Sequence, residues 1–262
     1  MFWMAVVLGI VEGLTEFLPI SSTGHLIVVS ELLQFTGRRA EAFQIFIQLG
    51  AILAVAWEYR QRLTRLALDL SRAPRARAFF LRLFLGFLPF AAVGLAFHEG
   101  LLEYLFHPAP VAAALIVGGL LIFVVEALPL NVRTHDTESM NWKQALAIGL
   151  AQCLALWPGF SRSAATILGG LGTGLDRRTA TEFSFFLALP TMIGATTYSL
   201  YRNYRVFEPG DALWLGLAFT VSFLVAWAAI RWLLRYVANH SFRLFAWYRI
   251  VLGAIILIVL GR

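Results

Sequence analysis

Two short stretches hold most of the polar side chains that could do chemistry. The first, residues 11–28, carries two carboxylates, a cluster of three consecutive hydroxyls and an imidazole, which are Glu12, Glu16, Ser21, Ser22, Thr23 and His25. Glu12 and Glu16 are four residues apart, so they would project from one face of a helix. A hydroxyl, an imidazole and a carboxylate can serve as nucleophile, base and orienting group.

The second stretch, Pro158–Thr166, carries an arginine and three further hydroxyls, which are Arg162, Ser161, Ser163 and Thr166. We expect Ser21 and Ser161 to cap two short helices whose first amides carry partial positive charge. Two helix N-termini, hydroxyls and one guanidinium would form an anion site that suits phosphate. Two carboxylates fit beside phosphate if a divalent cation lies between them, or if one acts as a base. A purely structural Glu16–Arg162 ion pair is the alternative.

The rest of the chain is apolar. Of its 262 residues, 60% are hydrophobic and 14% are charged, about half the charge of a soluble domain. This composition predicts an all-α polytopic membrane protein. Cys153 is the only cysteine, which excludes an internal disulfide and a cysteine metal cluster. The net charge of +6 comes from arginines between apolar runs, which favours lipid headgroups over nucleic acid as the partner.

The apolar runs predict six full crossings and two interrupted segments. The crossings are expected at 42–57, 79–97, 109–129, 182–201, 212–230 and 244–261. Residues 1–30 and 142–170 are broken near Pro19 and Pro158, and each half is too short to cross about 30 Å of hydrocarbon. We therefore expect two re-entrant helical hairpins. The N-terminal run lacks a basic region and a cleavage site, so it should be retained.

The two interrupted segments resemble each other at a shift of 140 residues. Over residues 9–28 and, further along, 40–53, eight of 34 positions match at this shift, among them Gly9 with Gly149 and Ser21 with Ser161. We expect one integral membrane domain, 1–262, with repeat one at about 1–130 and repeat two at about 141–262, joined by Asn131–Met140. One hairpin and three crossings per repeat would invert the second repeat relative to the first.

Loop charges predict the orientation. The arginine-rich segment 58–82 and the segment 231–243 should be cytoplasmic, and 98–107, which has no Lys or Arg, should be external. Both termini would then be external. The hairpins would enter from opposite sides, so their tips could meet. Buried hydroxyls, imidazole and charges in one membrane cavity indicate phosphoryl chemistry on a lipid phosphate.

The two motifs, Glu12-Gly-Leu-Thr-Glu16-Phe-Leu-Pro-Ile-Ser-Ser-Thr-Gly-His25 and Pro158-Gly-Phe-Ser-Arg-Ser-Ala-Ala-Thr166, resemble the signatures of the bacterial undecaprenyl-diphosphate phosphatases, the bacitracin-resistance family. The resemblance implies a plasma-membrane enzyme that converts undecaprenyl diphosphate to undecaprenyl phosphate and so recycles the carrier lipid for peptidoglycan synthesis. It implies a divalent cation, Mg²⁺ or Ca²⁺, and an active site that faces the periplasm.

Carried over residue by residue, the resemblance makes Glu12 and Glu16 the acidic motif that holds the metal or activates the nucleophile. Ser22 corresponds to the nucleophile, and His25 to a base or, alternatively, the nucleophile itself. Arg162 corresponds to the phosphate clamp. Ser161, Ser163 and Thr166 correspond to supporting phosphate ligands. Ser21 and Thr23 are expected to bind phosphate as well, from their place in the anion site rather than from the resemblance.

Inverted repeats with broken helices are also a transporter architecture, so the alternative function is a polyprenyl-phosphate flippase that uses the same cavity. A passive scaffold would leave the buried charges unexplained. The expected partners are the lipid substrate and membrane lipids, with no nucleic acid. A homodimer is left open, because the sequence is silent on oligomeric state.

Overall fold

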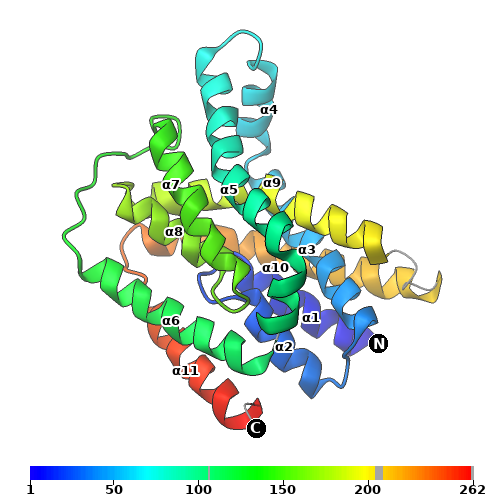
Figure 1. Cartoon of the computed structure of the whole chain (residues 1–262). Helices are drawn as coiled ribbons and strands as arrows, with labels where there is room; N and C mark the ends of the chain where they lie inside the picture. The colour runs from blue at the N-terminus through cyan, green and yellow to red at the C-terminus, as the bar shows by residue number, and fades with distance from the viewer. Residues whose placement is uncertain (106, 204–208, 261–262) are drawn as a thin grey trace.

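The computed structural model describes residues 1–105, 107–203 and 209–260, and this part of the chain is all-helical (Figure 1). Its helices are α1 (Phe2–Thr15), α2 (Ser22–Leu32), α3 (Arg38–Glu58), α4 (Arg60–Leu68), α5 (Pro74–Leu105), α6 (Pro108–Ala127), α7 (Trp142–Gln152), η1 (Cys153–Leu156), α8 (Arg162–Gly172), α9 (Arg177–Asn203), η3 (Pro209–Asp211), α10 (Ala212–Val237) and α11 (Arg243–Leu260).

Four of the described helices are long and apolar enough to cross a membrane: α3, the Pro74–Phe97 part of α5, α6 and α10. They match four of the six crossings expected from the sequence. The segments at 182–201 and 244–261 lie in helices α9 and α11, but neither helix is among the four. Helix α9 begins with Arg177 and Arg178 and buries threonines, so its polar content is high for a lipid-facing span.

Both expected helix breaks are confirmed. Helix α1 ends at Thr15 and α2 begins at Ser22, so residues 16–21 form a bent tip that contains Pro19. Helix α7 tightens into the 3₁₀ helix η1 and stops before Pro158, and α8 begins at Arg162. Proline lacks an N–H and disturbs the preceding turn, which accounts for the position of both breaks.

The three charged or polar segments expected to be loops are largely helical. Residues 58–82 form α4 and the start of α5, an arm that projects from the body of the molecule (Figure 1). Helix α5 continues to Leu105 across most of the segment 98–107, and α10 continues to Val237 across much of 231–243. Charge alone does not end a helix, because arginine has a high helix propensity.

Glycines let the first half of each hairpin lie close to a long helix. Helix α1 packs along α10, and α7 packs along α5. A Cβ on Gly9 would lie 2.6 Å from the Ala218 carbonyl oxygen, and a Cβ on Gly149 would lie 2.5 Å from that of Gly86. Both distances are too short for an alanine, so these contacts require glycine.

Two further helix pairs complete the frame, α3 against α9 and α6 against α11. The main core lies among α3, α5, α9 and α10 and is rich in aromatic rings, including Phe79, Phe183, Phe185 and Phe186. Phe17, in the first tip, packs edge-on to Phe185 with ring centroids 5.4 Å apart. The core thus reaches the tip from which the candidate residues project.

Candidate active site

The first tip places its polar side chains through a strained turn at Ser21. Ser21 has φ 71° and ψ 98°, a conformation that residues with a Cβ rarely adopt. Its side chain accepts a hydrogen bond from the Gly24 amide at 3.4 Å, so it caps α2 as expected. The turn leaves Ser22 as the first residue of α2 and Glu16 at the end of α1.

The second tip repeats this turn. Ser161 has φ 78° and ψ 118°, and its side chain accepts a hydrogen bond from the Ala164 amide at 3.2 Å. Gly159, with φ 94°, approaches α6 so closely that a Cβ would lie 2.3 Å from the Val111 carbonyl oxygen. Only glycine fits this combination of close approach and positive φ. Arg162 then becomes the first residue of α8.

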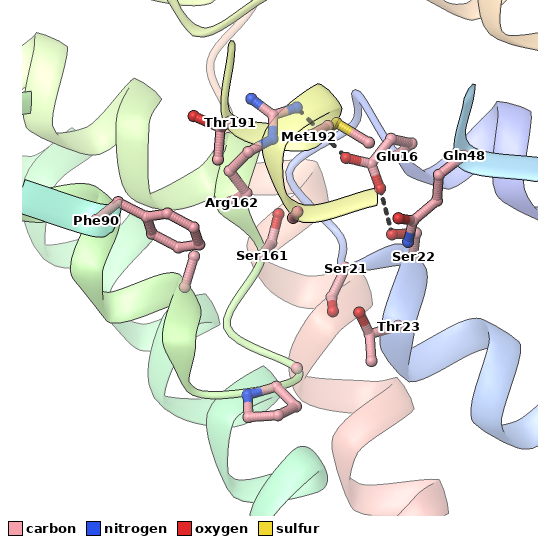
Figure 2. A pocket seen from close by; sticks show the side chains of 14 residues that line it. Glu16, Ser21, Ser22, Thr23, Gln48, Phe90, Ser161, Arg162, Thr191 and Met192 are labelled. Carbon is pink, nitrogen blue, oxygen red and sulfur yellow. Dashed lines mark hydrogen bonds and ion pairs between the residues drawn. The ribbon is translucent and has the colours of Figure 1, made fainter. Parts of the chain in front are cut away.

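The two tips meet at Glu16 (Figure 2). The Ser22 hydroxyl donates to Glu16 Oε2 at 2.5 Å, and Arg162 Nη2 lies 3.5 Å from Glu16 Oε1. Glu16 and Arg162 are both almost fully buried, with side chains 8% and 10% exposed. A second link joins the tips, because the Ser163 hydroxyl donates to the Leu18 carbonyl at 2.8 Å. One carboxylate therefore contacts both a candidate nucleophile and a candidate anion clamp.

A cavity of about 150 Å³ lies beside this cluster. Five of the site residues expected from the sequence line it together with Glu16: Ser21, Ser22, Thr23, Ser161 and Arg162. Three other helices complete the lining with Gln48 of α3, Phe90 of α5, and Thr191, Met192 and Ala195 of α9. Figure 2 shows Gln48 beside Ser22, and Thr191 and Met192 near Arg162. The cavity therefore has both polar and apolar side chains in its lining.

Ser163 and Thr166 do not line the cavity. Ser163 is fully buried and bonds Ser161 Oγ at 2.9 Å, and Thr166 donates to Ser184 Oγ at 2.7 Å. Arg162 Nη1 donates to the Ser184 carbonyl at 2.9 Å. These residues hold the second tip and aim the guanidinium, so their place is behind the residues that face the cavity.

His25 does not line the cavity, and both of its ring nitrogens bond groups other than Ser22. Its Nδ1 lies 2.7 Å from the Ser21 carbonyl, and its Nε2 lies 2.6 Å from the Tyr248 hydroxyl. A carbonyl only accepts hydrogen bonds, so Nδ1 carries a proton and Nε2 accepts from Tyr248 in the neutral imidazole. The two rings stack with their planes 3° apart. The base nearest to the Ser22 proton is therefore Glu16.

Comparison with known proteins agrees with the two motifs. Residues 5–255 match the family model described as "Bacitracin resistance protein BacA". The chain belongs to this family. It is 56% identical over 253 residues to the undecaprenyl-diphosphatase of Nitrosospira multiformis, covering 97% of this chain and 93% of the relative. It is 52% identical over 260 residues to the undecaprenyl-diphosphatase of Azotobacter vinelandii, covering 98% and 94% of the two chains. The resemblance seen in the sequence is confirmed, and this BacA family chain is a multi-pass membrane protein.

Glu12 is the member of the acidic motif that the protein leaves unpaired. It is fully buried, and within the described residues neither carboxylate oxygen has a hydrogen-bond partner. A group of three or more metal-ligating side chains does not occur in the described part of the chain. Mg²⁺ is commonly held by one or two carboxylates together with substrate phosphates, so Glu12 and Glu16 are a donor set that fits a divalent cation.

Sequence reasoning missed several residues around the BacA family motifs. Gln48, Phe90 and Thr191 carry no local signal, since their place at the cavity depends on how distant helices pack. Arg249 is different. It is an arginine inside the predicted crossing 244–261, and a buried charge in a membrane segment is a sign of function. That signal was available in the sequence.

Proposed function

We propose that this chain hydrolyses undecaprenyl diphosphate to undecaprenyl phosphate and inorganic phosphate, which recycles the carrier lipid for peptidoglycan synthesis and confers bacitracin resistance. The observation that carries the proposal is the contact of Glu16 with both Ser22 and Arg162 at the edge of the cavity. Membership of the BacA family and relatives named undecaprenyl-diphosphatase support the choice of substrate.

Ser22 is the proposed nucleophile. Its oxygen attacks the terminal phosphorus, and its proton passes to Glu16 Oε2, which lies 2.5 Å away. The bond between that phosphorus and the bridging oxygen breaks, so undecaprenyl phosphate leaves and a phosphoserine remains. Water then attacks the phosphoserine, which releases inorganic phosphate and restores the Ser22 hydroxyl.

The second tip supplies the positive charge that the reaction needs. Arg162 lines the cavity, and so do Ser22 and Thr23, so the N-termini of α8 and α2, with their partial positive charge, both border it. Charge grows on the bridging oxygen as it leaves. Donors fixed in advance in a dry cavity stabilise that charge more strongly than water does.

Glu12 and Glu16 are the residues that would hold the divalent cation. When bound, the cation would withdraw negative charge from the diphosphate oxygens. The fit rests on the free oxygens of Glu12 and on its separation from Glu16 by one helical turn. Of the two candidate bases for Ser22, Glu16 is preferred to His25, because the His25 nitrogens are bonded to Ser21 and Tyr248 rather than to Ser22.

The inverted two-repeat architecture is part of the proposal. It is supported by the matching turns at Ser21 and Ser161, by the matching close approaches of Gly9 and Gly149, and by the pairing of α3 with α9 and of α6 with α11. In this arrangement the cavity would open toward the periplasm, as the resemblance implies. Residues 1–130 and 141–262 would each contribute one tip.

The test is phosphate release from undecaprenyl diphosphate by the purified protein in detergent, with Mg²⁺ or Ca²⁺ and with EDTA. A flippase moves the lipid between the two leaflets of a bilayer without cleaving it, and a detergent micelle has no leaflets. A protein that is only a flippase would therefore release no phosphate in detergent. We expect release that depends on a divalent cation and on Arg162. A folded protein that releases none under any metal condition would rule out the hydrolase and favour the polyprenyl-phosphate transporter.

A further inference from the structure

Arg249 of α11 lies buried between the two tips. None of its surface is exposed. All of its hydrogen bonds in the described part of the chain go to backbone carbonyl oxygens: Leu115 at 3.3 Å, Pro19 at 3.0 Å, Ala114 at 3.2 Å, Gly159 at 3.2 Å and Phe160 at 2.6 Å. All three guanidinium nitrogens donate: Nε to Leu115, Nη1 to Pro19, and Nη2 to the other three carbonyls, which share its two N–H groups.

Three of these carbonyls belong to the unwound tips. Pro19 lies in the first tip, and Gly159 and Phe160 lie in the second. Where a helix is interrupted, carbonyls lose their intrahelical partners and need others if they are buried. One cation meets this need for both tips at once. Because these carbonyls bond the same guanidinium group, its width limits how far apart the two tips can lie.

We infer that Arg249 is a positioning residue for the phosphatase reaction: it holds the two tips at the separation at which Ser22 and Arg162 reach the same phosphate. This inference rests on the proposed function. The direct links between the tips, Glu16 with Arg162 and Leu18 with Ser163, involve groups at the site or next to it. Arg249 is fully buried and bonds only backbone carbonyls of the tips and of α6, so it joins the tips without using any side chain that faces the cavity.

Helix α6 makes room for the guanidinium at Gly118. A Cβ at this position would lie 2.0 Å from Arg249 Nη2 and 2.7 Å from Cζ. Gly118→Ala would therefore displace the guanidinium while keeping its charge. Gly253 of α11 is a matched control at the same α6–α11 interface. The three nearest atoms to its added Cβ would be Ile116 Cγ1 at 2.7 Å, the Ala112 carbonyl oxygen at 2.8 Å and Leu115 Cβ at 3.3 Å, so the guanidinium of Arg249 is not among its closest contacts.

The experiment compares kcat and KM of wild type, Gly118→Ala and Gly253→Ala, each normalised to the folded fraction in detergent. A misplacement of about 1 Å can lower a rate about 10²-fold, so we expect Gly118→Ala to lose roughly 10- to 100-fold in kcat with little change in KM. Gly253→Ala should lose thermal stability but keep kcat. A merely structural role would lower stability in both variants and leave kcat per folded molecule unchanged in both.

Arg249→Lys and Arg249→Met provide a second readout. Lysine keeps the charge but has three donors on one nitrogen, so it can reach only some of the five carbonyls. We expect kcat to fall in the order arginine, lysine, methionine. Equal kcat losses in Gly118→Ala and Gly253→Ala, or wild-type kcat in folded Gly118→Ala, would overturn the inference. An inactive wild type would instead defeat the proposed function, so the two failures are distinguishable.

Discussion

The two hairpin tips share a backbone and differ in their side chains. Ser21 and Ser161 have nearly the same positive φ, and each caps the following helix. At the next position, however, the first tip has Ser22 and the second has Arg162. The difference teaches how one turn can serve two purposes. In the proposed mechanism, the turn presents the nucleophile in one hairpin, and in the other it presents the cation that binds the anion under attack.

A second contrast lies one turn before each tip. The same shift of 140 residues places Glu12 opposite Gln152, and both side chains are fully buried. Within the described residues, Gln152 Nε2 donates to Thr191 at 3.4 Å and only its Oε1 lacks a partner, whereas both oxygens of the Glu12 carboxylate lack one. A buried unpaired carboxylate is costly, so its retention points to use in the reaction rather than to packing.

The largest expected effect is at the second tip. Arg162→Ala should lower kcat by at least about 10³-fold, because a guanidinium on a transferring phosphoryl group is commonly worth that much. The measurement is phosphate release in detergent. Arg178→Ala, an exposed arginine on α9, is the control and should keep full activity. Normal turnover by Arg162→Ala would remove the anion-binding role from this tip.

The next largest loss of kcat is expected from a substitution at the first tip. Glu16→Gln keeps the size of the side chain but weakens its ability to take the Ser22 proton, so kcat should fall about 10²-fold. Glu31→Gln changes an exposed carboxylate of α2 and should have no effect. If Glu16→Gln turned over like wild type, Ser22 would need another base, and His25 would return as the candidate.

Substitutions at Glu12 and at Gln152 should differ in how they change the concentration of divalent cation that activity requires. Glu12→Gln should raise the concentration of divalent cation needed for half-maximal activity by about tenfold or more, since it removes a charged ligand. Gln152→Leu should leave that concentration unchanged. A titration of activity with Mg²⁺ or Ca²⁺ after EDTA treatment gives both values, and equal shifts in the two variants would contradict the assignment of Glu12.

The smallest expected effect is a loss of stability from replacing Ser21 or Ser161, and it should be the same at both tips. Ser21 and Ser161 are strained caps, so alanine at either position should lower stability by about 1 kcal/mol. Glycine should be less destabilising than alanine, because it tolerates positive φ. Thermal unfolding in detergent should show this order at both positions. The opposite order at either one would mean that the two turns are not equivalent.

Local signals in the sequence predicted the tips well. Proline, glycine and serine fixed where α1 and α7 break, and the caps at Ser21 and Ser161 followed from the same residues. The helical arm at 60–68 was missed because its arginines were interpreted as a loop. Tyr248 and Gln48 could not be predicted, since they reach the site only through the packing of α11 and α3 against distant segments.

The central claim is that the two tips form one site. It is tested most directly by a double-mutant cycle with Glu16→Gln, Arg162→Lys and the double variant, each assayed for phosphate release from undecaprenyl diphosphate. Groups that act on the same phosphate are coupled, so the double variant should lose clearly less than the product of the two single losses. Losses that multiply, to within about 0.5 kcal/mol, would mean that the tips act independently and would contradict the account.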